Sequence, residues 1–149
     1  MFVPPDKNDL FLLGALMELL AGNWLEQGAV DRADQLYERA YALLRETWAD
    51  NLATINVLHK WALLKLQSGQ LDRARELADI EADLARQSYE KNKPWGDSPA
   101  LLIASLNLQA EILEKFGLSS EAASKREEAA SLAALPNTCL NGCKEPTQP

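Results

Sequence analysis

Three side chains in this sequence have the chemistry of a general base or a soft metal ligand: His59, Cys139 and Cys143. An imidazole can act as a base near neutral pH, and thiolates bind zinc or exchange disulfides. His59 is the chain's one histidine, so a metal site with two histidines cannot form within one copy. No nucleophile or orienting group accompanies it at a recognisable spacing, and neither a glycine-rich phosphate loop nor a serine-elbow motif occurs. We therefore expect a protein that is not an enzyme.

The two cysteines lie close to the C-terminus, on either side of a turn-forming Asn141-Gly142 pair. Zinc requires four ligands, and a second pair of ligands is missing, so we expect free thiols and neither a metal nor a cofactor. A disulfide or a zinc site shared between copies is the alternative, which would make the tail a redox-linked or metal-linked regulator. Two cysteines at one end do not form the disulfide framework of a secreted mini-domain, so a cytoplasmic location is expected.

Length and charge narrow the class of protein. The chain has 149 residues, of which 47% are hydrophobic and 25% charged, as in a single globular domain. The formal net charge of −7 repels phosphate backbones and anionic membrane surfaces, so neither nucleic acid nor a membrane is expected as a partner. The same charge permits basic partners.

One apolar segment near the N-terminus, Leu10–Ala21, resembles the core of a signal peptide. Asp6 and Asp9 precede it and Glu18 interrupts it, whereas a signal peptide has a basic start and an uncharged centre. It is also too short to span a bilayer. We interpret the segment as part of an ordinary buried helix.

Apolar residues recur at helical spacing along most of the chain, and no segment alternates as a strand does. We expect six helices, the first capped by Asp6 or Asp9 and the third by Asp50 or Asn51. The other predicted limits are 31–48 for the second helix, 72–89 for the fourth and 119–135 for the sixth. A loop is predicted over 91–99, with Ser98 as the cap and Pro99 as the first residue of the fifth helix. The predicted organisation is an N-terminal turn over 1–8, a helical domain over 9–135 and a flexible tail over 136–149.

Three glycines set the register of an internal repeat: Gly28, Gly69 and Gly117. Alanine occurs seven residues before each glycine and five residues after it, at positions 21, 62 and 110 and at positions 33, 74 and 122. Two antiparallel helices joined by a tight turn come closest near that turn, where small side chains let the backbones approach. The repeat therefore predicts three helical hairpins.

This skeleton resembles the tetratricopeptide repeat family, over about residues 10–135. Tyr37 and Ala40 stand where the family favours an aromatic residue and a second alanine, whereas Glu81 and Arg126 depart from the pattern in the later units. The glycines are separated by 41 and then 48 residues, against the family's usual spacing of about 34, which resembles repeats of the kinesin light chain type. The resemblance implies an all-α fold of three antiparallel helix-turn-helix hairpins, stacked as a short right-handed α-solenoid.

In this family the first helix of each hairpin lines a groove that binds a peptide or a helix. The resemblance therefore implies a non-catalytic protein-binding module, such as an adaptor, a scaffold or a small client chaperone. The groove positions that it implies are Glu18, Gly22, Asn56, His59, Leu63, Leu66, Asn107, Glu111 and Glu114.

The tryptophans and the last helix suggest two further hypotheses about how the protein binds a partner. Trp24 and Trp61 are predicted to lie in the core and Trp48 in a junction between hairpins. Trp95, in the predicted loop, is a candidate anchor for a partner, and the alternative is that it covers the gap between two hairpins. The alternative to binding another protein is self-association. In that case a homodimer forms through an apolar flank on the final helix, at Leu132 and Leu135.

Overall fold

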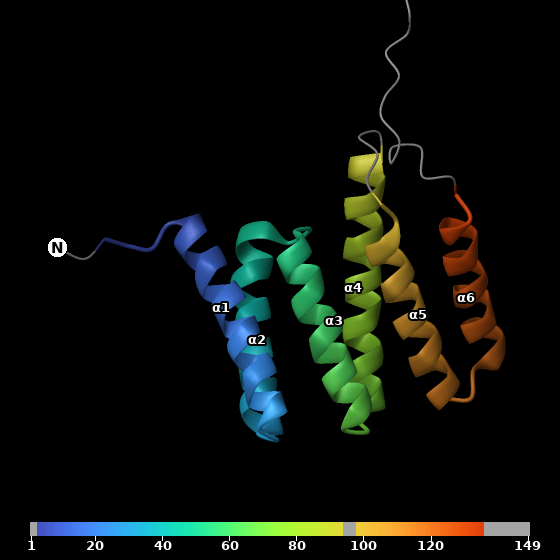
Figure 1. The fold of residues 1–149 in the computed structure, drawn as a ribbon, viewed down its shortest axis with the longest axis horizontal. Coiled ribbons are helices and arrows are strands. Elements are labelled where there is room, and N and C mark those ends of the chain that lie inside the picture. The colour runs from blue at the N-terminus through green and yellow to red at the C-terminus, as the bar shows by residue number, and fades with distance from the viewer. Residues whose placement is uncertain (1–2, 94–97, 136–149) are drawn as a thin grey trace, which may run out of the picture.

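The computed structural model describes residues 3–93 and 98–135, which form six α-helices and no strand (Figure 1). The all-α fold class is confirmed. No helix within these ranges has both the length and the hydropathy needed to cross a membrane. The helices are α1 (Lys7–Glu26), α2 (Val30–Trp48), α3 (Leu52–Gln67), α4 (Leu71–Asn92), α5 (Ala100–Lys115) and α6 (Ser119–Ala133).

Two helices begin at side-chain caps that the sequence predicted. Asp6 caps α1 by accepting from the backbone N–H of Asp9 at 2.8 Å, and Asp9 accepts from the N–H of Asp6 in return. Asn51 caps α3 through the N–H of Ala53 at 2.9 Å. Each cap satisfies backbone donors that have no partner inside the helix, so these helices start where their caps stand.

The three repeat glycines end α1, α3 and α5 in the same way. Gly28, Gly69 and Gly117 have φ values of 77°, 73° and 76°, a region that side chains with a Cβ resist. At each turn, the N–H of the glycine and that of the next residue bond back to carbonyls of the last helical turn, as at Gly28 to Leu25 and Ala29 to Trp24. This paired pattern reverses the chain within a few residues, so the next helix folds back on the previous one.

The six repeat alanines are all fully buried, as predicted, and they let α1 pack on α2, α3 on α4 and α5 on α6. A further close approach occurs at Gly14 of α1, which the sequence did not single out. A Cβ built on Gly14 would lie 2.7 Å from Cγ of Leu44, a fully buried residue of α2. The first hairpin therefore depends on a glycine in the middle of a helix as well as on its turn.

The three pairs of helices lie in a row along the long axis of the molecule (Figure 1). The second helix of each pair contacts the first helix of the next, α2 with α3 and α4 with α5. The largest core cluster joins the first two pairs and reaches α5 through Leu108 and Ile112. A second cluster, around Leu102 and Leu106, joins α3 and α4 to α5 and α6. A third, smaller cluster of Ala110, Leu113 and Ala122 joins α5 to α6, so buried clusters follow one another along the row.

Some predicted boundaries were wrong around the connection between α4 and α5. The helix α4 continues through Asn92, past the predicted end at Tyr89 and into the predicted loop. Lys91 pairs with Asp50 at 3.0 Å, and Tyr89 is buried, so contacts with the rest of the protein hold this last turn. Pro99 occupies the cap position rather than the first helical position, and Ser98 accepts from the N–H of Ala100. Residues 94–97, with Trp95, and the predicted tail 136–149 lie outside the described residues.

The prediction that α1 is an ordinary buried helix was also wrong. Only Gly14 and Ala21 of α1 are buried, and five of its leucines are between 43% and 65% exposed. Trp24 is half-buried: it packs against the main core cluster, and the guanidinium of Arg32 lies over its ring. The five exposed leucines are Leu12, Leu13, Leu16, Leu19 and Leu20.

The final helix does not carry the apolar flank that was predicted there. Leu132 packs against the second core cluster, and Leu135 is exposed just beyond the end of α6. The exposed apolar residues gather instead at the opposite end of the row, on α1.

Two glycines in α1 offer a matched test of the packing between α1 and α2. We expect Gly14→Ala to lower the free energy of unfolding by about 1–2 kcal/mol, because overpacking against Leu44 outweighs the gain in helix propensity. Gly22, also helical, has no atom within 4 Å of an added Cβ, so Gly22→Ala should raise stability by up to about 1 kcal/mol. Urea denaturation of both variants measures the difference. Equal stabilities would show that the side chain of Leu44 does not pack closely against the backbone of α1 at Gly14.

Candidate functional site

The first helices of the three pairs present one row of equivalent positions. Glu18, His59 and Asn107 each lie ten residues before a repeat glycine, on α1, α3 and α5. The side chain of Lys60 on α3 pairs with Glu18, and α3 also contacts α5. These three helices are therefore neighbours, and we call the surface that they share the A-helix face.

The other predicted groove residues differ in how much of each side chain is available. Asn107 and Glu111 on α5 are exposed, and Asn107 has no hydrogen bond to any described residue. Asn56 is half-buried, and Leu63 is half-buried against the main core cluster. Gly22 is half-buried, Leu66 lies in the core, Glu114 pairs with Arg126, and Trp95 is outside the described residues. The exposed polar part of the A-helix face thus centres on α5.

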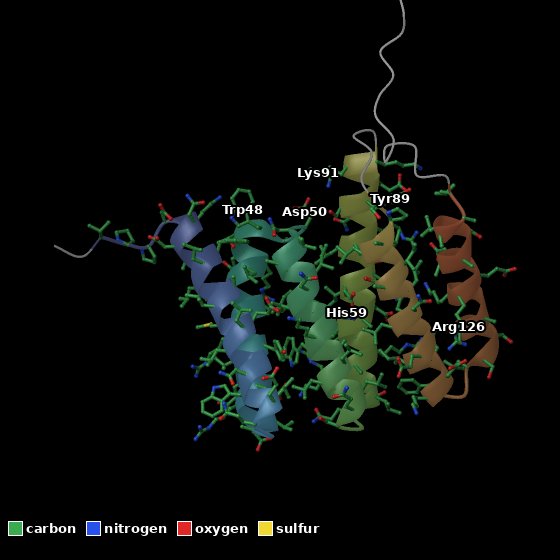
Figure 2. All side chains as sticks on the ribbon, in the orientation of Figure 1. Trp48, Asp50, His59, Tyr89, Lys91 and Arg126 are labelled. Carbon is green, nitrogen blue, oxygen red and sulfur yellow. The ribbon has the colours of Figure 1, made fainter. Side chains whose placement is uncertain are left out.

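His59 is held by a buried carboxylate from the neighbouring helix. Its Nδ1 lies 2.8 Å from Oε1 of Glu81 on α4, and its side chain is 30% exposed (Figure 2). Glu81 is fully buried, and the hydroxyl of Ser105 on α5 lies 2.6 Å from the same Oε1. Oε2 of Glu81 has no hydrogen-bond partner among the described residues. One carboxylate oxygen therefore joins α3, α4 and α5.

Glu81 raises the pKa of the His59 imidazole, first through its hydrogen bond and also through its charge. Partial burial and the neighbouring Lys60 act in the opposite direction but are outweighed. Because the folded-state pKa is raised, the pair stabilises the fold in full below about 6.5, the usual histidine pKa. That stabilisation is lost as the pH rises through the raised pKa.

His59, Glu81 and Ser105 are not arranged as in a catalytic triad. In such a triad the imidazole stands between the hydroxyl and the carboxylate, so that it can take the hydroxyl proton. Here the carboxylate stands between the imidazole and the hydroxyl of Ser105, and that hydroxyl is fully buried. The cluster is arranged to hold helices together. Residues 3–93 and 98–135 contain no group of three potential metal ligands, and Cys139 and Cys143 fall outside these ranges.

A second network, centred on the partly exposed Asp34 of α2, was not foreseen from the sequence. One oxygen of Asp34 accepts from the indole N–H of Trp61 at 2.6 Å, and the other lies 2.8 Å from Nζ of Lys65. Lys65 also donates to Gln70 at 3.0 Å, which satisfies a buried ammonium group. Asp34 thus joins the first pair of helices to the second, as Glu81 joins the second to the third. An aspartate in an amphipathic helix normally faces water, so this role of Asp34 could not be predicted from the sequence.

A surface hollow of about 220 Å³ lies beside the start of α1. It is lined by Phe11, Trp48, Asn8 and Asn51, from α1, the end of α2 and the cap of α3. Trp48 is 44% exposed, so the prediction that it packs within a junction is corrected: it stands at the rim of this hollow (Figure 2). The hollow is apolar on two sides and offers amide groups on the others, which suits an aromatic or aliphatic side chain of a peptide.

A scan against protein-family models and a search of curated proteins found no match to this chain.

The His59–Glu81 pair predicts a specific pH dependence of stability. The free energy of unfolding should fall as the pH rises above about 6.5 and through the raised pKa of His59, because the imidazole then loses its proton and its charge beside Glu81. In the variant His59→Gln, which lacks the chain's one histidine, this fall should be absent. Urea denaturation at a series of pH values checks the difference between the two proteins. Parallel pH profiles would contradict the pairing.

The same pair predicts non-additive effects of substitution. We expect His59→Ala to destabilise the protein by about 1–3 kcal/mol at pH 6, because the buried Glu81 loses its charged partner. A second change, Glu81→Gln, should recover part of that loss, since no buried charge then remains unpaired. Denaturation of the two single variants and the double variant gives the coupling. Additive effects would mean that the two side chains do not interact.

Proposed function

We propose that this chain is a non-catalytic helical-repeat protein that binds a segment of another protein along the A-helix face. In this proposal the fold is a short right-handed solenoid of the tetratricopeptide type, with three hairpins. The protein acts in the cytoplasm as an adaptor, a scaffold or a small client chaperone. It uses no cofactor, and it binds neither nucleic acid nor a membrane.

The repeat geometry supports the assignment to this type of fold. The three glycines share one backbone conformation, and the alanines seven before and five after each of them are fully buried. Ala40 and Ala129, twelve residues after their glycines, are buried as well. Equivalent residues thus have equivalent packing roles in successive hairpins, which is the defining property of a repeat protein.

The observation that carries the proposed binding site is the side-by-side arrangement of the first helices. The Lys60–Glu18 ion pair joins α1 to α3, and the packing of α3 on α5 continues the surface. Along this surface the amides of Asn56 and Asn107 can bond to a peptide backbone. The carboxylate of Glu111 favours a basic residue, as does the net charge of −7. The hollow beside Trp48 supplies an apolar pocket at one end.

A partner with these features would be an extended or helical segment that carries basic residues and at least one large apolar side chain. Its polar groups would meet the amides and carboxylates of α5, and its apolar residue would fill the hollow. Recognition through shape complementarity and hydrogen bonds needs no catalytic residue. The carboxylate of Glu81 lies between the imidazole of His59 and the hydroxyl of Ser105. This arrangement supports a structural role for the histidine, and hence a binding protein rather than an enzyme.

Affinity capture with variants of the two surfaces tests the proposal. The groove variant is Asn56→Ala, Asn107→Ala and Glu111→Lys, which avoids the structural His59. The control carries Gln35→Ala, Glu38→Lys and Arg39→Ala, all exposed on α2. We expect a partner that the wild type and the control retain and that the groove variant loses by at least about tenfold in affinity, because contacts at binding hot spots dominate.

Circular dichroism and urea denaturation establish that both variants remain folded. A partner retained equally by both variants would place the binding surface elsewhere and contradict the proposal. Loss of binding only in the α2 control would assign the site to the opposite face of the molecule.

A further inference from the structure

The five exposed leucines of α1 form one surface, which we call the leucine face. Leu12, Leu16 and Leu19 follow one another at spacings of four and three residues, so they lie along one stripe, with Leu13 and Leu20 beside it. The α1 helix is at one end of the row, and among the described elements it packs mainly on α2 (Figure 1). Five leucines exposed together on one helix are typical of a surface that another protein covers.

The repeat register identifies what kind of surface this is. Leu13, Leu16 and Leu20 of α1 correspond to Thr54, Val57 and Trp61 of α3, all buried. They correspond on α5 to three further buried residues, Leu102, Ser105 and Gln109. Leu13, Leu16 and Leu20 therefore lie at the positions through which α3 packs on α2 and α5 packs on α4, whereas Leu19 corresponds to the exposed Lys60.

Two of these corresponding residues, Trp61 and Gln109, carry polar groups that bond to the preceding hairpin. Trp61 donates back to Asp34 of α2, and Gln109 donates to Asp79 of α4 at 2.7 Å. At the same position α1 has Leu20, which is exposed. In the two internal helices this position reaches a side chain of the preceding hairpin, whereas on α1 it is apolar. The leucine face is thus a stacking surface whose side chains suit an apolar counterpart.

Charge and asymmetry point to the nature of that counterpart. Between Leu10 and Leu25 the one charged residue is Glu18, which is paired with Lys60 on the side that faces α3. The leucine face itself is uncharged, although the chain carries a net charge of −7. The leucine face has no acidic group that would attract a basic partner. A second copy of this acidic chain can approach the leucine face, because no like charges meet in the contact.

The opposite end of the row does not complement the leucine face. The exposed residues of α6 are small or charged, as at Ala123, Arg126, Glu127 and Ala130, and a single exposed leucine, Leu135, follows that helix. Stacking of α6 from one copy on α1 of the next would therefore leave the leucines against polar groups. A closed contact in which α1 meets α1 places leucine on leucine instead.

We propose that the leucine face binds a second copy of this chain, with the two α1 helices antiparallel about a two-fold axis at Leu16. In that arrangement Leu16 meets Leu16 of the partner copy, Leu12 meets the position of Leu20, and Leu13 meets that of Leu19. All five leucines are then matched, and the helix dipoles oppose one another favourably. The contact lies opposite the side of α1 that packs on α2, and it leaves the A-helix face of α5 free for a different partner.

The size of the contact sets its strength. A helix of twenty residues is about 30 Å long, and a stripe about 10 Å wide along it is smaller than the roughly 800 Å² per partner of a standard stable interface. The dimer should therefore dissociate on dilution, with a Kd in the range of about 1–100 µM. Sedimentation equilibrium from a few micromolar to several hundred micromolar should show the mass rising from the 16.5 kDa of one chain towards twice that value.

The variant Leu16→Glu places two carboxylates against each other on the axis, and it should weaken the dimer by at least about 100-fold. Leu52→Glu is the matched control, because Leu52 is equally exposed but lies on α3, and it should leave the Kd unchanged. Circular dichroism establishes that both fold. A strict monomer at every concentration, or a dimer unaffected by Leu16→Glu, would overturn the proposal.

Disulfide trapping tests the antiparallel geometry, in a background with Cys139→Ser and Cys143→Ser. Leu16→Cys should form a covalent dimer under mild oxidation, and Leu12→Cys should do so only when mixed with Leu20→Cys. Rapid trapping by Leu12→Cys alone would indicate parallel helices and overturn the arrangement, and Leu52→Cys controls for random collision. Dimerisation and capture of a groove partner are measured on separate variants, so failure of one is distinguishable from failure of the other.

Discussion

The close approach of two helices across a glycine turn is the constraint on which the rest of this structure depends. Gly28, Gly69 and Gly117 take a backbone conformation that other residues resist, and buried alanines on both sides let the helices touch. A pair of helices packed in this way is thin and buries too little apolar surface to be stable alone. Each pair must therefore pack on a neighbour, and that requirement explains both the buried clusters along the row and the exposed leucines at its end.

The two junctions between neighbouring pairs, α2 with α3 and α4 with α5, are held by different polar groups. Asp34 ties α2 to α3 through Trp61 and Lys65, whereas Glu81 ties α4 to both α3 and α5 through His59 and Ser105. Buried polar groups such as Glu81 and Lys65 are costly to desolvate, and we expect them to contribute more to a unique register than to overall stability. Because the junctions are not interchangeable, the pairs can stack in one order only. The leucine face has no such polar group, which leaves its pairing to shape and apolar contact.

The sequence predicted the local structure well because local structure depends on local signals. Helical periodicity, the Asn51 cap and the glycine–alanine register are properties of short segments, and the structure confirms each of them. It predicted the exposure of α1 wrongly, because an apolar stripe is the same whether a neighbouring helix covers it or not. The roles of Glu81 and Asp34 depend on residues 22 to 31 positions away along the chain. A carboxylate at a position where the repeat has alanine was the one available signal for Glu81.

The central claim is that each pair of helices is stabilised by its neighbours in the row, and native-state amide hydrogen exchange tests it most directly. The experiment is done at a concentration well below the Kd of the proposed dimer, so that the chain is monomeric. We predict the highest protection in α3 and α4, which are covered on both sides, and lower protection in α1 and α6 at the ends. Uniform protection, or an α1 as protected as α3, would contradict the account.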